Sequence, residues 1–157
     1  MNNYIIGYLT GINYNNSKSI LEKIAIKYGI GLKEILPEQL FQFTDKYLPD
    51  KNDTNFIFSM SDCPDCEEAD YLIDYLDYAP EMQSKFPPLG RDRLQILISI
   101  LEEMVIKTKC SKLVISLTDS GYIYSYKVIK FAEISKTLFL DFELNQGAPD
   151  TLYEIIC

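Results

Sequence analysis

Cys63 and Cys66 are separated by two residues, and this spacing marks them as the residues of the chain most suited to chemistry. Two such thiols can exchange with a partner thiol when they follow a strand and open a helix. The apolar segment 56–60 precedes the pair and is expected to be a strand, and the segment after it is expected to be a helix. The sequence therefore offers a candidate redox pair whose first thiol would be activated by the positive end of the helix.

The motif Cys63-Pro64-Asp65-Cys66 resembles the dithiol motif of the glutaredoxin and thioredoxin families. The resemblance implies a thiol-disulfide oxidoreductase with Cys63 as the nucleophile and Cys66 as the resolving thiol. Pro149 is the only candidate for the cis-proline that these families place before a strand, and it lies far downstream. Carboxylates also crowd the pair and oppose formation of a thiolate; they are Asp62, Asp65, Glu67 and Glu68.

Histidine is absent from the chain. Its absence removes Ser-His and Cys-His nucleophile pairs and most catalytic zinc sites. The seven glycines form neither a phosphate-binding loop nor a dinucleotide fingerprint. Cys110 and Cys157 do not form a second pair at the same spacing. We expect Cys110 to be a core or helix-end residue and Cys157 to be a terminal residue. We therefore predict no cofactor, no metal site and no enzyme, unless the Cys63 and Cys66 pair provides the chemistry.

The negative charge of the chain is concentrated in one short stretch. Eight of the 23 acidic residues lie between Asp62 and Glu81, where there is no lysine or arginine. The fifteen acidic residues elsewhere balance the 15 basic residues, so the stretch carries the whole net charge of -8. Such a concentration favours a role in binding a basic partner over a merely solvated surface.

On a helix the acidic stretch would form two stripes, one of carboxylates and one of tyrosines. Tyrosine offers a rigid surface with a hydroxyl, and carboxylates around it select a basic partner and speed the encounter. The alternative is a solvated helix face whose tyrosines lean on the core. The predicted partner-binding residues are Glu67, Asp70, Tyr71, Asp74, Tyr75, Asp77, Tyr78 and Glu81.

The general build of the chain resembles the immunity proteins of bacterial toxin systems, including contact-dependent growth inhibition and polymorphic toxins. The resemblance rests on a small acidic chain without catalytic motifs and on the segments 112–119 and 148–155. It implies a cognate toxin domain as partner, often a nuclease whose basic cleft is masked, with no direct binding of nucleic acid or membrane. A mimic of DNA that binds other basic proteins would share the same electrostatics.

The periodicity of apolar residues predicts an α/β fold of the α+β type, with a single mixed sheet, a C-terminal β-hairpin and four to five helices. The chain is expected to form a single domain over residues 1–157. Strands are expected at 4–9, 56–60, 112–118, 122–129 and 152–156, with 112–118 and 122–129 forming the hairpin. Helices are expected from residue 17 or 19 to 28, from 37 to 48, from 61 or 62 to 78, from 90 to 107 and around 131–142, although a strand stays open for 137–144.

The composition and the apolar runs of the chain indicate the cellular compartment to be expected. With 47% hydrophobic residues over 157 positions, the chain can bury a core without disulfides. No apolar run approaches the roughly 18 residues that span a bilayer, and the first residues lack the positive flank of a secretory signal. We therefore expect a soluble cytoplasmic protein with reduced cysteines.

Overall fold

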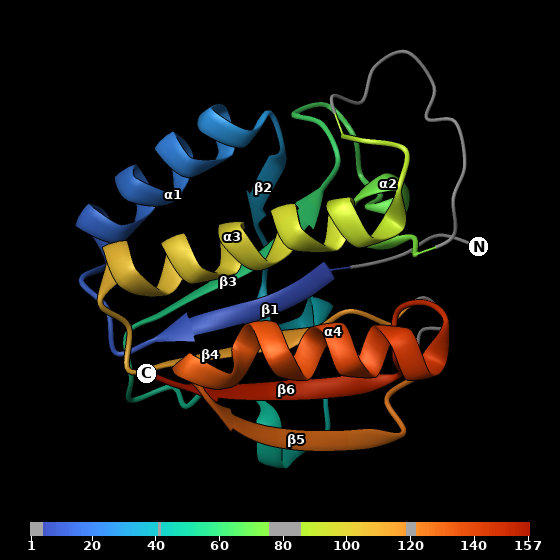
Figure 1. The fold of residues 1–157 in the computed structure, drawn as a ribbon. Helices are drawn as coiled ribbons and strands as arrows, with labels where there is room; N and C mark the ends of the chain where they lie inside the picture. Colours follow the sequence, from blue (N-terminus) through green and yellow to red (C-terminus); the bar gives the residue numbers. More distant parts are fainter. Residues whose placement is uncertain (1–4, 41, 76–85, 119–121) are drawn as a thin grey trace.

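The structure is a computed structural model that describes residues 5–40, 42–75, 86–118 and 122–157. Its centre is a six-stranded sheet with the strand order β2-β3-β1-β4-β6-β5. Every neighbouring pair is antiparallel except β5 and β6, which run parallel (Figure 1). The strands are β1 (Ile5–Thr10), β2 (Gly31–Glu34), β3 (Asn55–Ser61), β4 (Lys112–Ser116), β5 (Ser125–Lys130) and β6 (Thr151–Ile156).

Helices cover one face of the sheet. Figure 1 shows α1 and α3 over the half that holds β2, β3 and β1, and α4 over the half that holds β4, β6 and β5. The main core lies between these helices and the sheet. The helices are α1 (Tyr14–Tyr28), α2 (Asp70–Ile73), α3 (Gly90–Thr108) and α4 (Ile134–Asn145).

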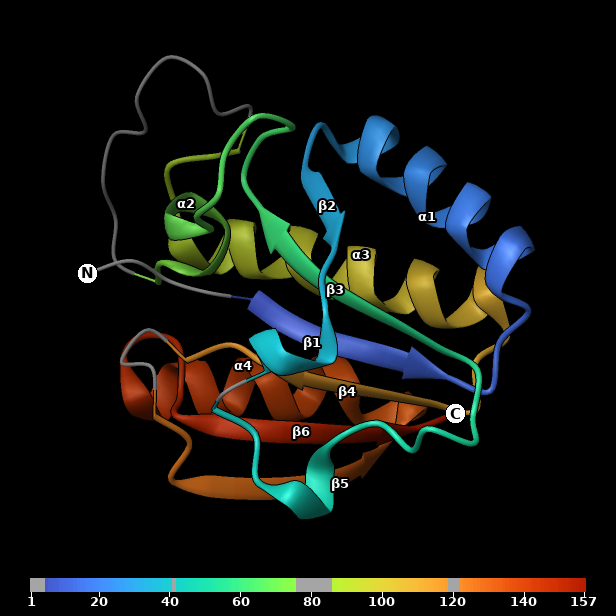
Figure 2. The ribbon, with the colours of Figure 1, turned by 180° about the vertical axis from the view of Figure 1, so that it is seen from behind.

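The opposite face of the sheet is covered in part by the segment between β2 and β3. This segment holds two short 3-10 helices, η1 (Pro37–Gln39) and η2 (Asp45–Tyr47), and Figure 2 shows it crossing the sheet. Leu40 and Phe43 from this segment pack on Ile6 and Ile57 of the sheet in a second, smaller apolar cluster. Since β1 lies in the middle of the sheet under both covers, all six of its residues are buried.

The predicted fold class is confirmed, because one mixed sheet and four α-helices are present in the described part of the chain. The predicted helix at 90–107 corresponds to α3, and the ambiguous segment near 131–144 forms a short 3-10 helix, η3 (Phe131–Glu133), followed by α4. None of the described helices has the length and apolar character that crossing a membrane would need.

The predicted C-terminal hairpin is wrong. β4 pairs with β1 and β6, whereas β5 pairs only with β6 and runs parallel to it. The chain leaves β5, passes through α4 and returns as β6, which inserts between β4 and β5. A parallel pair needs such a long crossover, and the turn residues after β4 give no sign of it.

Two predicted helices are also corrected. In the described residues of the segment 37–48 the only helices are η1 and η2. The segment lies across the sheet and covers it, with Leu40 and Phe43 in the smaller apolar cluster, instead of presenting one continuous apolar stripe. The segment predicted as one helix from 61 or 62 to 78 begins as a loop, and α2 covers only Asp70–Ile73. Residues 76–78 of that prediction lie outside the described residues.

Candidate functional site

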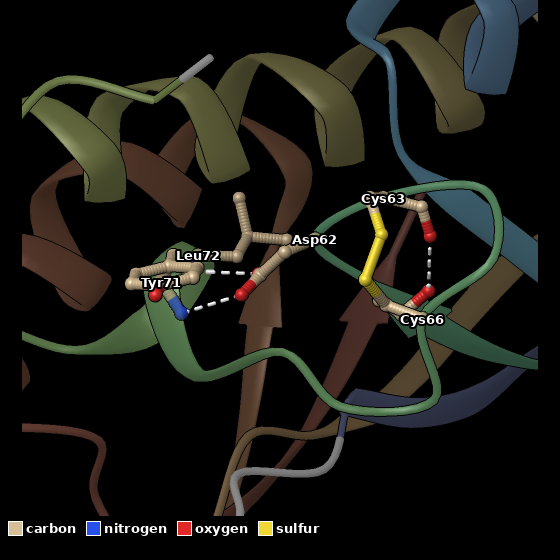
Figure 3. Close-up of a disulfide and its surroundings, with 6 residues drawn as sticks. Asp62, Cys63, Cys66, Tyr71 and Leu72 are labelled. Carbon is tan, nitrogen blue, oxygen red and sulfur yellow. Dashed lines mark hydrogen bonds between the residues drawn. A yellow bond between two sulfur atoms is a disulfide. The ribbon is translucent and has the colours of Figure 1, made fainter. Parts of the chain in front are cut away.

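The loop between β3 and α2 is closed by a disulfide. Figure 3 shows Cys63 bonded to Cys66, and the backbone N–H of Cys66 donates to the carbonyl of Cys63 at 3.1 Å. The expectation of reduced cysteines is therefore wrong for this pair, whose Cα atoms are 5.1 Å apart, within the range that a disulfide spans. Cys66 is exposed and Cys63 is half-buried, so Cys66 is the more exposed residue of the pair.

Asp62 fixes the base of this loop. Its side chain is buried, and its carboxylate accepts hydrogen bonds from the backbone N–H groups of Tyr71 at 2.5 Å and Leu72 at 2.8 Å (Figure 3). The backbone N–H of Asp62 also donates to the carbonyl of Glu68 at 3.1 Å. Asp62 therefore does cap a helix, as its residue type indicates, but the helix begins at Asp70 and the cap reaches across the loop.

Gly31 lets the disulfide loop lie against β2. Gly31 is paired with Ser61 at the end of the ladder between β2 and β3. A Cβ atom at position 31 would lie 2.7 Å from the carbonyl oxygen of Cys63 and would also meet the hydroxyl of Ser61. That hydroxyl already donates to the Cys63 carbonyl at 3.0 Å, so neither group is free to withdraw. The absence of a side chain at Gly31 is thus what allows this close approach.

Replacing Gly31 with alanine is expected to lower the free energy of unfolding by about 1–3 kcal/mol, because the loop backbone must move away from β2. Urea denaturation of the oxidised protein measures the loss. Gly147→Ala is the matched control, since no atom lies within 4 Å of a Cβ added there. Equal stability of the two variants would show that the loop does not depend on its approach to Gly31.

A groove of about 910 Å³ runs beside the disulfide loop. Its lining includes the apolar residues Ile6, Leu32 and Ile35, together with Gln39 and Gln42. The charged and sulfur-bearing residues that line it are Lys33, Glu38, Asp65, Cys66 and Glu67. The groove therefore carries three carboxylates against one lysine.

The three carboxylates of the groove are open to a partner. Glu38, Asp65 and Glu67 are exposed, and in the described part of the chain none of them joins an ion pair. They come from two segments, since Glu38 lies in η1 while Asp65 and Glu67 lie in the disulfide loop. The lining of the groove is therefore negative overall, and its charges are not neutralised by those four ion pairs.

The predicted partner-binding residues are only partly brought together. Glu67 lines the groove, but Tyr71 and Tyr75 are half-buried and pack against the main core. Tyr75 donates from its hydroxyl to the Glu143 carboxylate of α4, and its ring lies 6.3 Å from that of Phe142. These tyrosines hold α2 on the core, as the alternative interpretation of the sequence expects.

The helix expected to carry the two stripes is short, since in the described part of the chain α2 covers only Asp70–Ile73. Asp74 is half-buried after the end of α2, and its backbone carbonyl accepts hydrogen bonds from Arg93. Asp70 is the first residue of α2. Asp77, Tyr78 and Glu81 lie outside the described residues. Sequence reasoning missed Glu38, which has no nearby motif and reaches the groove only through the packing of η1.

The pattern of the dithiol families is met only in part. The bond before Pro149 is trans, since the described residues contain no cis peptide bond. Cys66, not Cys63, lines the groove and is the more exposed residue, whereas the resemblance implies that Cys63 is the nucleophile. The described residues contain no cluster of three or more histidine, cysteine or acidic side chains that could hold a metal ion.

The fold and the site define an α+β protein with an acidic groove beside a disulfide-closed loop. Comparison with protein-family models, with curated proteins and with solved structures gave no match.

Proposed function

We propose that this protein is an immunity protein, which binds a basic toxin domain through the acidic groove and blocks it without chemistry of its own. The observation that carries the proposal is the groove lined by Glu38, Asp65 and Glu67, three exposed carboxylates outside the observed ion pairs. The resemblance to immunity proteins supports the same partner class and a cytoplasmic location. The docking surface proposed from the structure shares Glu67 with the surface predicted from the sequence.

The physical basis of the proposal is competition for a positive field. A nuclease domain holds phosphates with lysine and arginine, and carboxylates at matching positions occupy the same field and exclude the substrate. The apolar residues Ile6, Leu32 and Ile35 in the lining of the groove would contact the aliphatic part of a lysine or arginine side chain. The disulfide and the Asp62 cap hold the loop in place, so less conformational entropy is lost when the partner binds.

The test uses co-expression with the product of the neighbouring gene, followed by measurement of association rates for the purified pair. Replacing Glu38 and Glu67 with glutamine and Asp65 with asparagine is expected to slow association roughly tenfold at low salt, with a smaller difference at high salt. The groove variant should also protect less well against the toxic activity of the partner.

The matched control removes three carboxylates elsewhere. Glu22, Asp45 and Asp53 are exposed and do not line the groove. Changing them to glutamine or asparagine alters the net charge by the same amount and is expected to change association much less. If both triple variants slow association equally, net charge and not the groove is responsible, and the proposed docking site is wrong.

A second candidate function is thiol-disulfide exchange, which is favoured by the position of the exposed Cys66 at the groove. A thiolate of a bound partner would attack the Cys66 sulfur and form a mixed disulfide with it, while the bond between Cys63 and Cys66 breaks and Cys63 leaves as a thiolate. In the reverse direction, the reduced pair would attack a disulfide of the partner through Cys66, and Cys63 would then release the partner as a thiol. An insulin reduction assay with dithiothreitol as reductant separates the two functions. Reductase activity of the unmodified protein that is lost in Cys66→Ser would favour exchange. If the unmodified protein has no reductase activity, exchange is excluded and only the binding function remains.

A further inference from the structure

The two cysteines outside the disulfide loop lie side by side, although 47 positions separate them in the sequence. The sulfur atoms of Cys110 and Cys157 are 3.4 Å apart. Cys110 follows α3 and precedes β4, and Cys157 follows β6. In both Figure 1 and Figure 2 the mark of the C-terminus lies near the connection between α3 and β4. All four cysteines of the chain thus fall into two spatial pairs.

The pairing of β4 with β6 holds these two sulfur atoms together. The antiparallel ladder joins Lys112 to Ile156, and the next rung is made by the backbone N–H of Cys157, which donates to the carbonyl of Ser111 at 3.1 Å. Ser111 is itself anchored to Thr10 of β1, because its backbone N–H donates to the Thr10 carbonyl at 2.9 Å. The contact between the two thiols therefore follows from the central strands of the sheet and not from a chance approach of two loops.

We propose that Cys110 and Cys157 are an oxidative cross-linking site, which forms a second disulfide when the protein meets a low-molecular-weight disulfide such as oxidised glutathione. A closing movement of little more than 1 Å joins the sulfurs, since they are 3.4 Å apart and a disulfide bond measures about 2 Å. The cross-link would tie the start of β4 to the end of β6.

The order of the two exchange steps follows from exposure. Cys157 is exposed and Cys110 is buried, so the oxidant meets Cys157 first. Cys157 gives up its proton as its sulfur attacks one sulfur of the small disulfide, so that a mixed disulfide forms and the other half leaves with the proton as a thiol. Cys110 then attacks the Cys157 sulfur and releases the second thiol. Overall, two protein thiols and one small disulfide become one protein disulfide and two small thiols.

The electrostatics of the pair support Cys110 as the attacking group in the second step. The pKa of Cys110 is lowered, first by a hydrogen bond from Cys157; burial acts in the opposite direction, and the Thr108 side chain and backbone groups lower the pKa further. The pKa of Cys157 is raised, first by its hydrogen bond to Cys110 and then by burial. Because Thr108 and the backbone remain in place when Cys157 is modified, Cys110 keeps part of this support in the mixed disulfide.

The test uses the double variant Cys63→Ser with Cys66→Ser, which retains only the second pair. The variant is equilibrated in mixtures of reduced and oxidised glutathione. Its free thiols are then alkylated with N-ethylmaleimide under denaturing conditions, and its intact mass is measured by mass spectrometry. We expect two maleimide adducts at the reducing end, none at the oxidising end and no bound glutathione at either end. The oxidised form should melt roughly 5–15 °C above the reduced form, because the cross-link closes a long loop.

Two single replacements made in the double variant assign the steps. With Cys110→Ser we expect Cys157 to hold one glutathione that no second thiol can release. With Cys157→Ser we expect Cys110 to remain a free thiol, because it is buried. Two free thiols across the whole series, or a cross-link between two molecules, would overturn the proposal. Circular dichroism of each variant confirms that it is folded before exposure to the oxidant.

Discussion

Replacement of Arg93 with methionine is expected to lower the free energy of unfolding by about 3–5 kcal/mol. Arg93 lies in the first turns of α3 and is fully buried. Its guanidinium donates to the carbonyls of Asp74 at 2.8 and 3.1 Å, of Pro87 at 3.0 Å and of Pro88 at 2.5 Å. Methionine fills similar space but donates nothing, so the carbonyls of Asp74, Pro87 and Pro88 lose these hydrogen bonds.

Arg91→Met is the matched control for this replacement. Arg91 lies on the same helix two residues earlier but is exposed, and its guanidinium lies 4.7 Å from the centre of the Phe139 ring. We expect its loss to cost less than about 1 kcal/mol, as for an exposed cation over an aromatic ring. Urea denaturation of both variants gives the comparison. Similar midpoints would mean that the bonds of Arg93 to these carbonyls contribute little to stability.

Arg93 also shows why part of this region could not be predicted from the sequence. An arginine near the start of a helix is unfavourable for the helix dipole, and arginine is a residue type that is rarely fully buried. In the structure the guanidinium donates to the backbone carbonyls of Asp74, Pro87 and Pro88, which lie on both sides of the segment 76–85. Such a role depends on how two separate segments of backbone pack together, so no local sequence pattern predicts it.

The elements that could be predicted are those with a strong periodic pattern of their own. The apolar residues Leu94, Leu97, Leu101 and Met104 recur at helical spacing, and α3 buries all four. The short apolar runs of β1, β3 and β4 were likewise recognisable, because buried central strands need apolar residues on both faces. The order of these strands in the sheet could not be predicted, since the apolar run of each strand could pair with that of any other.

The acidic segment illustrates the opposite case. Asp62, Pro64 and the carboxylates after them are typical of a helix start, and the sequence predicts a helix from there. The disulfide and the buried Asp62 carboxylate hold residues 62–69 as a loop instead, and the helix begins eight residues later. Tertiary contacts overrode the local preference, so the candidate site contains Glu38, Asp65 and Glu67 in place of a stripe along one helix.

Stability is expected to fall steeply above pH 10, partly through Tyr153. Tyr153 is fully buried, and its hydroxyl donates to the Asp141 carboxylate at 2.7 Å. Burial, and next the hydrogen bond to Asp141, raise the pKa of Tyr153 well above its usual value. Since the folded state keeps this proton, the stabilisation is complete below the unfolded pKa of about 10 and is lost as pH rises above it, at about 1.4 kcal/mol per pH unit.

Tyr153→Phe separates this contribution from the other groups that titrate at alkaline pH, including the buried Tyr8, whose pKa is also raised by burial. At pH 7 the variant is expected to be less stable by about 1–2 kcal/mol, because Asp141 keeps only its two hydrogen bonds from Lys127, at 2.7 and 2.8 Å. Above pH 10 its stability should fall less steeply, by about 1.4 kcal/mol per pH unit, so that the two curves converge within one or two pH units. Tyr124→Phe, at a side chain that is 74% exposed, is expected to give a curve parallel to that of the unmodified chain. Urea denaturation at a series of pH values measures all three curves, and a constant gap between Tyr153→Phe and the unmodified chain would show that Tyr153 does not couple folding to pH.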